Sequence, residues 1–274
     1  MTIYREKKEN IQNALTIAGS DSCGGAGIQA DLKTFSALGL YGLSAITSLT
    51  AQNTMGVKKI YSVDPIFFKE QLVCLFEDID ISTVKIGMLE NEKIIKIVFE
   101  VLEKYRPKFI VLDPVMFSKN GNLLIEKKDI NNLKEFLLPI ASIITPNILE
   151  SAMLTNKKTA ENEEEIMEQG EILKKICKRV LIKGGHYSKK DSSDWFFSKN
   201  KKIRFYAQRI KTKRKIHGTG CTFSSALASF RVYKKNWIDS VQSAKTWIQK
   251  CIIKSNFLKV GKGLKVLNHF YECW

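Results

Sequence analysis

The chain has 274 residues, of which 44% are hydrophobic, and it carries a formal net charge of +16. This composition fits a globular core and excludes a membrane-spanning segment, because no apolar run reaches about 18 residues. The charged start lacks the apolar stretch of a secretory signal. We therefore expect a cytoplasmic protein with no membrane partner, folded as one domain over 1–274 with 1–12 as a loose extension.

Apolar runs alternate with helical patterns along the chain. Residues 13–19 form a short apolar run that ends in glycine and predicts a buried strand, and 27–38 has the pattern of a helix. Further strands are predicted at 42–49, 83–88, 109–113, 142–145 and 179–183. Further helices are predicted at 65–78, 91–105, 129–138 with Asp129 as its cap, from 147, at 162–177, from 218 and at 237–256. A polar hairpin is predicted at 194–197 and 203–206.

Strands that alternate with helices at this spacing predict an α/β fold. The expected architecture has three αβα layers, with a mostly parallel central sheet covered by helices on both faces. Ligands of such sheets bind where the carboxyl ends of the strands meet the loops. Side chains that directly follow the predicted strands are therefore the candidates for a shared site.

Two loops that follow the first two strands offer ligand contacts. The glycine-rich turn from Gly19 to Gly27 would let backbone approach a ligand closely, although it could equally be a tight connection. It matches neither the phosphate-binding GK[ST] loop nor GxGxxG. In AQNT, the Gln52 carboxamide can both donate and accept, which suits the edge of an aminopyrimidine. The alternative for this amide is a turn cap.

Two carboxylates and a lysine follow later strands. Asp113 in LDPVM and Glu150 in TPNILE could hold Mg²⁺, usually through water, or could serve as a cap and as a first-turn helix acid. Lys183 ends the apolar run LIK, where an ammonium group is costly unless it meets an anion such as phosphate. Its alternative is to extend its charge into solvent.

The most specific segment is HGTGCT, from His217 to Thr222. Glycines at the start of a helix direct several unpaired N–H groups at one point, which predicts an anion hole for phosphoryl charge. Small residues follow, so the helix can pack closely on the sheet. Cys221 falls in the first turn, where the helix dipole is expected to lower the pKa of the thiol. The alternatives are a small buried cysteine and a purely structural His217.

Taken in order, the chain resembles the hydroxymethylpyrimidine/phosphomethylpyrimidine kinase family of thiamine biosynthesis, within the ribokinase-like superfamily. The resemblance covers nearly the whole chain. It rests on LTIAGSDSCGGAGIQADLKTFSALG, AQNTMGV, KIGML, VLDPVM, ITPNILE, IKGGH and HGTGCTFSSALAS. It implies a ribokinase-like fold, a homodimer, Mg²⁺, and ATP as the donor that phosphorylates 4-amino-5-hydroxymethyl-2-methylpyrimidine and then its monophosphate.

The resemblance also assigns roles to residues of this chain. Catalytic roles fall on Gly218, Thr219, Gly220, Cys221 and Lys183. The pyrimidine is expected at Gly19, Asp31, Gln52, Met88 and Val115. Phosphates and nucleotide are expected at Asp113, Asn147, Glu150, Lys183, Thr212 and His217, with Asp113 and Glu150 near the metal.

Cys221 stands where ribokinase relatives often carry an aspartate base. Because phosphoryl transfer has a loose transition state, we expect Cys221 mainly to position the hydroxyl and to take its proton late. The chain departs from the family pattern in VGKGLKVLNHF near its end, with Lys262 and Lys265, and at Cys23 in the first glycine turn.

Three other functions compete with this one. A pyridoxal kinase shares fold and chemistry, but AQNT favours a pyrimidine. A catalytically silent binding protein is disfavoured by the intact GTGC turn. A nucleic-acid binder would exploit the positive charge, but the 37 Lys and 7 Arg are scattered, so no nucleic-acid partner is expected. The six cysteines form no CxxC pair, which argues against structural zinc and favours a reducing compartment.

Overall fold

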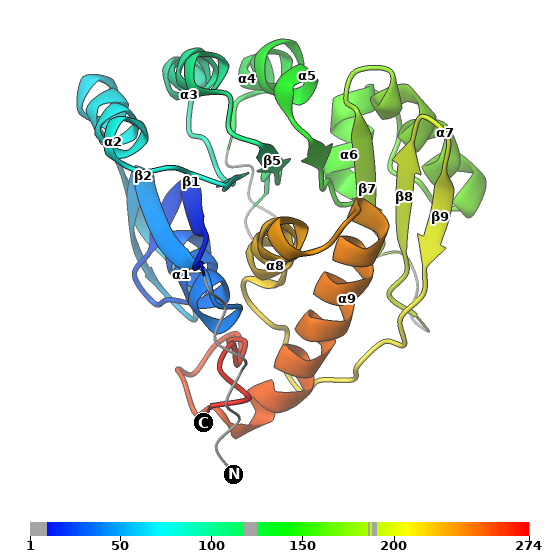
Figure 1. Cartoon of the computed structure of the whole chain (residues 1–274). Helices are drawn as coiled ribbons and strands as arrows, with labels where there is room; N and C mark the ends of the chain where they lie inside the picture. Colours follow the sequence, from blue (N-terminus) through cyan, green and yellow to red (C-terminus); the bar gives the residue numbers. More distant parts are fainter. Residues whose placement is uncertain (1–9, 118–124, 186, 188–190, 274) are drawn as a thin grey trace.

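The computed structural model describes residues 10–117, 125–185, 187 and 191–273. Within them, nine strands form one sheet in the order β3-β2-β1-β4-β5-β6-β7-β8-β9 (Figure 1). The pairs from β2 to β7 are parallel, and β3, β8 and β9 are antiparallel at the two edges. The strands are β1 Asn13–Asp21, β2 Tyr41–Asn53, β3 Gly56–Ser62, β4 Thr83–Ile86, β5 Phe109–Leu112, β6 Ile143–Ile144, β7 Arg179–Lys183, β8 Asp194–Ser198 and β9 Lys202–Phe205.

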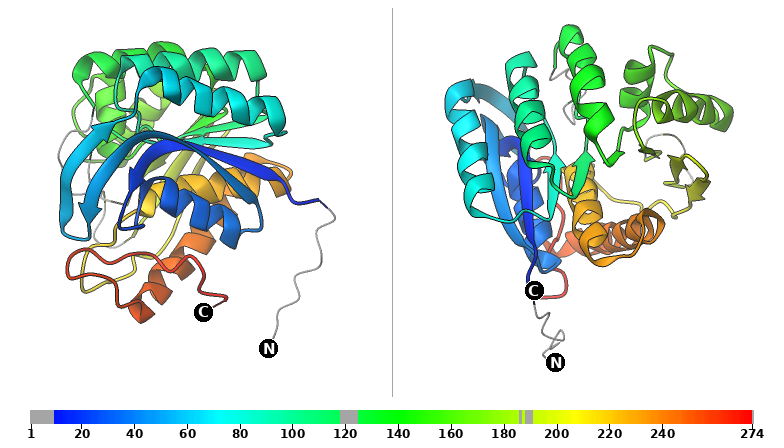
Figure 2. Two further views of the ribbon diagram at one scale, coloured as in Figure 1. Left: turned by 90° about the vertical axis from the view of Figure 1, so that its left-hand side faces the viewer. Right: turned by 45° about the horizontal axis from the view of Figure 1, so that its top comes forward.

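Helices cover both faces of this sheet, which confirms the predicted three-layer α/β fold (Figures 1 and 2). One face carries α1, α8 and α9, and the other carries the helices from α2 to α7. The helices are α1 Gly27–Ala37, α2 Pro65–Asp78, α3 Glu92–Tyr105, α4 Lys127–Asn132, α5 Leu138–Ile140, α6 Ile148–Thr155, α7 Glu163–Lys174, α8 Thr219–Tyr233 and α9 Trp237–Lys254, with a π-helical turn at Leu133–Leu137. No helix among the described residues has the length and apolar character needed to cross a bilayer.

The sheet separates two hydrophobic clusters. Leu15 and Ile17 of β1 face the cluster under α2 and α3, whereas Ala14 faces the cluster under α1, α8 and α9. Strands of a parallel sheet are buried on both faces, which explains why β1 reads as an almost continuous apolar run. The helix α8 buries the small side chains of Ala226 and Ala228, and it lies against β4 and β5 on one side and α9 on another.

Three local expectations were wrong. Asp129 does not cap its helix: the helix begins after Glu126, and Asp129 lies in its first turn. The AQNT segment is not a loop, because β2 continues through Asn53 and turns into the antiparallel β3. The hairpin of β8 and β9 is polar only on β9, since Trp195 and its neighbours on β8 are buried.

The strand order places a topological switch at β1. From β1 the chain proceeds to β2 on one side and later to β4 on the other. In open parallel sheets the loops diverge at such a point and leave room for a ligand at the carboxyl ends of the strands. The turn after β1 and the start of α8 meet at this point, because a Cβ on Gly218 would lie 1.7 Å from the Gly25 carbonyl oxygen.

Candidate active site

An ion pair between two strand ends forms one end of the site. Lys183 Nζ, at the end of β7, lies 2.6 Å from Asp113 Oδ1, just beyond β5. Thr145 donates a hydrogen bond to the same oxygen at 3.1 Å, and Ser224 of α8 donates to Asp113 Oδ2 at 3.2 Å. Burial opposes ionisation of Asp113, but the Lys183 and Lys85 ammonium groups hold its pKa below the ordinary value. Lys183 therefore meets an anion at its strand end, as its placement requires.

The glycine turn before α8 lies over this pair. A Cβ on Gly220 would lie 3.5 Å from Lys183 Nζ and 3.6 Å from Asp113 Oδ2. Gly218 is the N-cap of α8 and has a φ of 76°, in the left-handed region that favours glycine. The unpaired N–H groups of the first turn of α8, including Thr219, therefore start beside the lysine. This juxtaposition provides two sources of positive potential for one anion.

Glu150 and Asn147 begin α6 beside the ion pair. The Asn147 side chain accepts from the Glu150 N–H at 2.9 Å, and Glu150 Oε2 accepts from the Asn147 N–H at 2.7 Å. Burial and, to a smaller extent, the Asp113 carboxylate raise the pKa of Glu150 to about 7 against the opposing effect of Lys183. Glu150 is thus the first-turn helix acid that the sequence offered as its alternative, it completes a capping box with Asn147, and its charge also interacts with Asp113. Two such carboxylates fit a hard divalent cation, which prefers oxygen ligands.

Cys221 lies in the first turn of α8, but its thiol is not activated. Burial, together with the Asp31 and Asp113 carboxylates, raises the pKa of Cys221 to about 11 against the opposing effect of Lys85. The expectation that the helix dipole lowers this pKa was therefore wrong. Desolvation and nearby negative charge outweigh the partial charge of a helix end. The thiol is protonated at neutral pH.

A second ion pair, which the sequence analysis missed, lies beneath Cys221. Lys85 Nζ of β4 is 2.7 Å from Asp31 Oδ2 of α1, and both side chains are fully buried. Thr16 and Ser225 each donate to the Asp31 carboxylate at 2.6 Å. Burial lowers the pKa of Lys85, but Asp31 and other anionic groups raise it above the ordinary value. The signal was a lysine inside the apolar strand TVKI, the same pattern that drew attention to Lys183.

The burial of Asp31 changes the reading of that residue. It was expected near the pyrimidine, but its carboxylate accepts hydrogen bonds from Lys85, Thr16 and Ser225 in the protein interior. These bonds join β1, β4, α1 and α8 around one carboxylate. Asp31 is therefore placed to hold elements together beneath the site rather than to contact a ligand directly.

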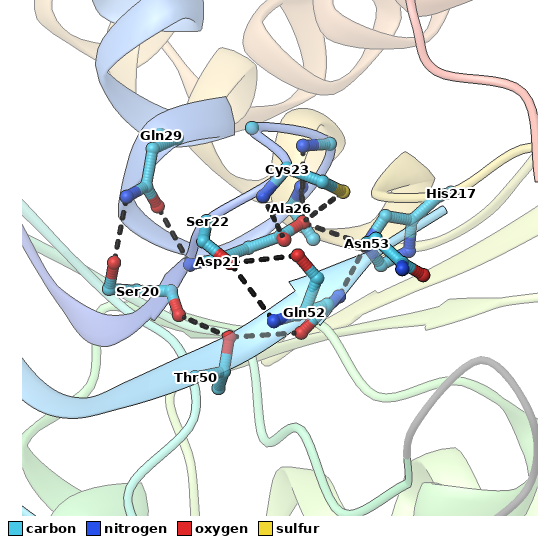
Figure 3. A network of polar contacts seen from close by, with 12 residues as sticks. Ser20, Asp21, Ser22, Cys23, Ala26, Gln29, Thr50, Gln52, Asn53 and His217 are labelled. Carbon is cyan, nitrogen blue, oxygen red and sulfur yellow. Dashed lines mark hydrogen bonds and ion pairs between the residues drawn. The ribbon is translucent and has the colours of Figure 1, made fainter. Parts of the chain in front are cut away.

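The other end of the site is a polar network around the turn after β1 (Figure 3). The Gln52 N–H donates to Ser22 Oγ at 2.9 Å, and the Ser22 hydroxyl donates to the Gln52 carbonyl oxygen at 2.8 Å. His217 Nε2 lies 2.9 Å from Gln52 Nε2 and 2.9 Å from Asp21 Oδ2. Gln52 and His217, both singled out from sequence, are thus in direct contact.

Asp21 is the centre of that network. Its carboxylate accepts from the backbone N–H groups of Cys23 at 3.0 Å, Gly25 at 3.1 Å and Ala26 at 2.8 Å. Burial raises the pKa of Asp21, but hydrogen bonds from His217 and Cys23 lower it below the ordinary value. For Cys23, burial and the Asp21 carboxylate raise the pKa to about 11. Sequence reasoning did not assign Asp21 a role.

The remaining candidates lie around these two ends. Gly19 of β1 adjoins Met88, because a Cβ on Gly19 would lie 2.8 Å from Met88 Cε. Val115 follows Asp113, and its N–H donates to the Asp113 carbonyl at 2.8 Å. Thr212 lies between β9 and α8, and within the described residues it makes no hydrogen bond or ion pair with the other candidates.

The divergent C-terminal segment also borders the site. The Leu264 N–H donates to the Thr54 carbonyl at 2.8 Å, just beyond Gln52, and the His217 N–H donates to the Lys265 carbonyl at 2.8 Å. His269 Nε2 lies 2.9 Å from Thr222 Oγ1 in α8. The segment therefore joins the hairpin of β2 and β3 to the start of α8.

Comparison with known proteins agrees with this geometry. Residues 21–268 match the family model described as phosphomethylpyrimidine kinase. The chain is 48% identical over 263 residues to the hydroxymethylpyrimidine/phosphomethylpyrimidine kinase of Escherichia coli, covering 96% of this chain and 98% of that protein. It is 41% identical to the Rhizobium meliloti enzyme of the same name, covering 95% and 98%.

Solved structures show the same fold. A phosphomethylpyrimidine kinase from Clostridium difficile has a TM-score of 0.78 and 42% identity, covering 88% of this chain and 99% of that one. An ADP complex of Bacillus subtilis pyridoxal kinase has a TM-score of 0.87 at 29% identity, covering 95% and 98%. With this match of fold, sequence and converging strand ends, the chain belongs to the phosphomethylpyrimidine kinase family, whose members are phosphotransferases.

Proposed function

We propose that the chain transfers the γ-phosphate of ATP to the hydroxymethyl group of 4-amino-5-hydroxymethyl-2-methylpyrimidine, and then phosphorylates the monophosphate to the diphosphate in thiamine biosynthesis. The observation that carries the proposal is the approach of Gly220 to Lys183 and Asp113. Gln52 lies at the other end of the same loops. A donor phosphate at the first end and a pyrimidine at the second would face each other across Cys221.

The charges favour a mechanism based on electrostatic stabilisation. The alcohol oxygen attacks the γ-phosphorus while the bond to the leaving ADP oxygen breaks, and charge collects on the phosphoryl oxygens. Lys183 and the N–H groups of the GTG turn stabilise that charge. Because the Cys221 pKa is about 11, its thiol holds the hydroxyl oxygen in place and cannot take the proton. The proton then passes to the transferred phosphoryl group.

Mg²⁺ is the proposed metal. Asp113 and Glu150 would hold it, through water, with the oxygen donors that it prefers. Burial is the main cause of the raised pKa of Glu150 and the Asp113 carboxylate adds to it, and a divalent cation would offset both by stabilising the charged form. When bound, it supplies positive charge to the donor phosphates.

Pyridoxal is the second candidate substrate. It also carries a hydroxymethyl group on a six-membered nitrogen ring. The structure of the Staphylococcus aureus pyridoxal kinase with ADP has a TM-score of 0.88 to this chain at 29% identity, covering 96% and 95%. A catalytically silent pyrimidine-binding protein would keep the Gln52 network but release no ADP.

Coupled detection of ADP tests these functions together. The purified chain with Mg²⁺ and ATP is given the hydroxymethylpyrimidine, its monophosphate, or pyridoxal. We expect the highest kcat/KM with the pyrimidine and a second ADP released from the monophosphate. A higher kcat/KM with pyridoxal would overturn the substrate assignment, and ADP release that no acceptor stimulates would overturn the kinase assignment.

The assembly and location are also proposals. We infer a homodimer formed along β3, because this edge strand and its turn expose apolar side chains, including Met55, Val57, Ile60 and Tyr61. Tyr61→Lys should convert the dimer to a monomer in light scattering, and an unchanged mass would refute this interface. The six free cysteines support a reducing cytoplasm, and the continuous sheet supports a single kinase domain.

A further inference from the structure

Three metal-ligating side chains converge at the turn after β1. Asp21, Cys23 and His217 place one carboxylate oxygen, one sulfur and one imidazole nitrogen within 4.8 Å of one another (Figure 3). His217 Nε2 is 2.9 Å from Asp21 Oδ2, and Cys23 Sγ is 3.5 Å from the same oxygen. Zinc–ligand bonds of about 2.0–2.3 Å in tetrahedral geometry separate neighbouring ligand atoms by about 3.3–3.7 Å. The 3.5 Å separation of Cys23 and Asp21 lies within this range, whereas the 2.9 Å separation of His217 and Asp21 is a hydrogen bond that must lengthen by about 0.5 Å when an ion enters.

The surrounding backbone holds these ligands in place. The N–H groups of Gly25 and Ala26 donate to Asp21 Oδ2, and such outer contacts orient a ligating carboxylate. The His217 backbone is fixed by its N–H bond to Lys265, and its ring lies against Gly25, where a Cβ would come within 2.5 Å of Cδ2. The ligands thus come from two rigid turns that are distant in sequence, which is why spacing along the chain does not predict them.

The donor set also selects the type of metal. A thiolate with an imidazole and a carboxylate suits a borderline cation such as Zn²⁺, whereas Mg²⁺ prefers oxygen donors throughout. We propose that Asp21, Cys23 and His217 bind one Zn²⁺ ion, with water at the fourth position. This cluster lies at the Gln52 end of the candidate active site, whereas Asp113 and Glu150 lie at the other end, and it goes beyond the proposed kinase function, on which it does not depend.

Direct metal binding tests the proposal. The full chain, stripped of metal and kept in millimolar Mg²⁺, is titrated with Zn²⁺ against a chromophoric chelator and separately with Co²⁺. We expect one Zn²⁺ per chain with a dissociation constant in the micromolar range or tighter, and a thiolate-to-cobalt charge-transfer band in the near ultraviolet. Zn²⁺ binding should release protons, because the thiol must lose its proton to ligate.

Cysteine variants identify the ligand. Cys23→Ser should weaken Zn²⁺ binding at least tenfold and abolish the charge-transfer band, while circular dichroism checks that the variant is folded. Cys74→Ser and Cys273→Ser are matched controls at exposed free cysteines and should bind as the wild type does. The proposal is overturned if the wild type does not bind Zn²⁺ in this range, if Cys23→Ser binds it equally well, or if either control loses it to the same extent.

Discussion

Lys85 and Lys183 are two lysines on parallel strands of one sheet, β4 and β7, and they differ in exposure. Each lies in an apolar parallel strand and each pairs with an aspartate, at 2.7 Å for Lys85 and 2.6 Å for Lys183. The Lys85 pair is 0% exposed on both side chains, whereas Lys183 is 16% exposed. A fully buried ammonium group can contact only its protein neighbours, whereas a partly exposed one can also bind an incoming phosphate. Exposure, rather than residue type or strand, separates a structural lysine from a candidate catalytic one.

The largest expected effect on stability comes from removing the lysine of the fully buried Lys85–Asp31 pair. Lys85→Met leaves the buried Asp31 carboxylate without its cation and should lower the free energy of unfolding by about 3–5 kcal/mol. Urea denaturation measures this. Lys183→Met is the matched control and should cost clearly less, because water reaches that site. Equal losses in the two variants would show that exposure does not distinguish the pairs, and Asp31→Asn combined with Lys85→Met should recover part of the loss.

Substitution of the partly exposed Lys183 should have the opposite effect and reduce turnover more than stability. Lys183→Met removes positive charge from the place where phosphoryl charge would develop, so kcat should fall about 10²–10³-fold with little change in folding. Steady-state kinetics with the hydroxymethylpyrimidine measures the change. A variant that keeps kcat within threefold of the wild type would remove Lys183 from the mechanism.

His269 extends the comparison to a buried imidazole, which contacts the Thr222 hydroxyl rather than a carboxylate. Burial lowers the pKa of His269 to about 3, and Lys33 contributes. At His269 the unfolded chain binds a proton below about pH 6.5 and the folded chain does not. The contribution of the neutral imidazole to the free energy of unfolding is therefore complete above pH 6.5 and is lost as the pH falls toward 3. Between pH 6.5 and 5 the expected loss is about 1.6 kcal/mol. Urea denaturation at both pH values should show that His269→Gln lacks this contribution to the pH dependence; an identical slope would contradict the assignment.

Cys221 lies between the two lysines, and its substitution should have the smallest effect. Because its thiol is protonated, Cys221→Ser replaces one hydroxyl-positioning group by another, and kcat should stay within about tenfold of the wild type. The wild-type kcat should also not rise in proportion to hydroxide between pH 7 and 9. A tenfold increase per pH unit there would instead identify the thiolate as the reactive form.

Much of the fold could be predicted from sequence because period and turn residues are local. The apolar run of β1 and the helix starts near Asn91 and Asn147 were recognisable, and in the structure both asparagines are N-caps. The strand β3 was not, because its residues are exposed and its pairing with β2 carries no apolar period. Asp129 failed as a cap because the helix starts earlier, at Lys127, and local preference does not fix which acid leads a helix.

The site was predictable where a residue's type conflicts with its strand. Lys183 ends an apolar run and meets an anion. Lys85 is likewise a lysine in an apolar strand, TVKI. It was overlooked because it lies inside the strand, whereas the candidates were sought at the strand ends. Asp31 was misplaced because its partners, Thr16, Lys85 and Ser225, become neighbours only in the folded chain. The Cys221 pKa likewise depends on burial and on carboxylates far away in sequence, which no local pattern reports.

The contact between Gly218 and the Gly25 carbonyl, together with the His217–Asp21 bond, has a consequence for synthesis on the ribosome. His217 and Asp21 are 196 residues apart in the sequence. The turn after β1 can therefore form these contacts only after a segment near the end of the chain has been synthesised. Early strands can emerge and pair while Gly218 and His217 do not yet cover this turn. A chain released prematurely, before the turn that starts α8, therefore carries all nine strands with Asp113, Glu150 and Lys183, but the turn after β1 stays uncovered.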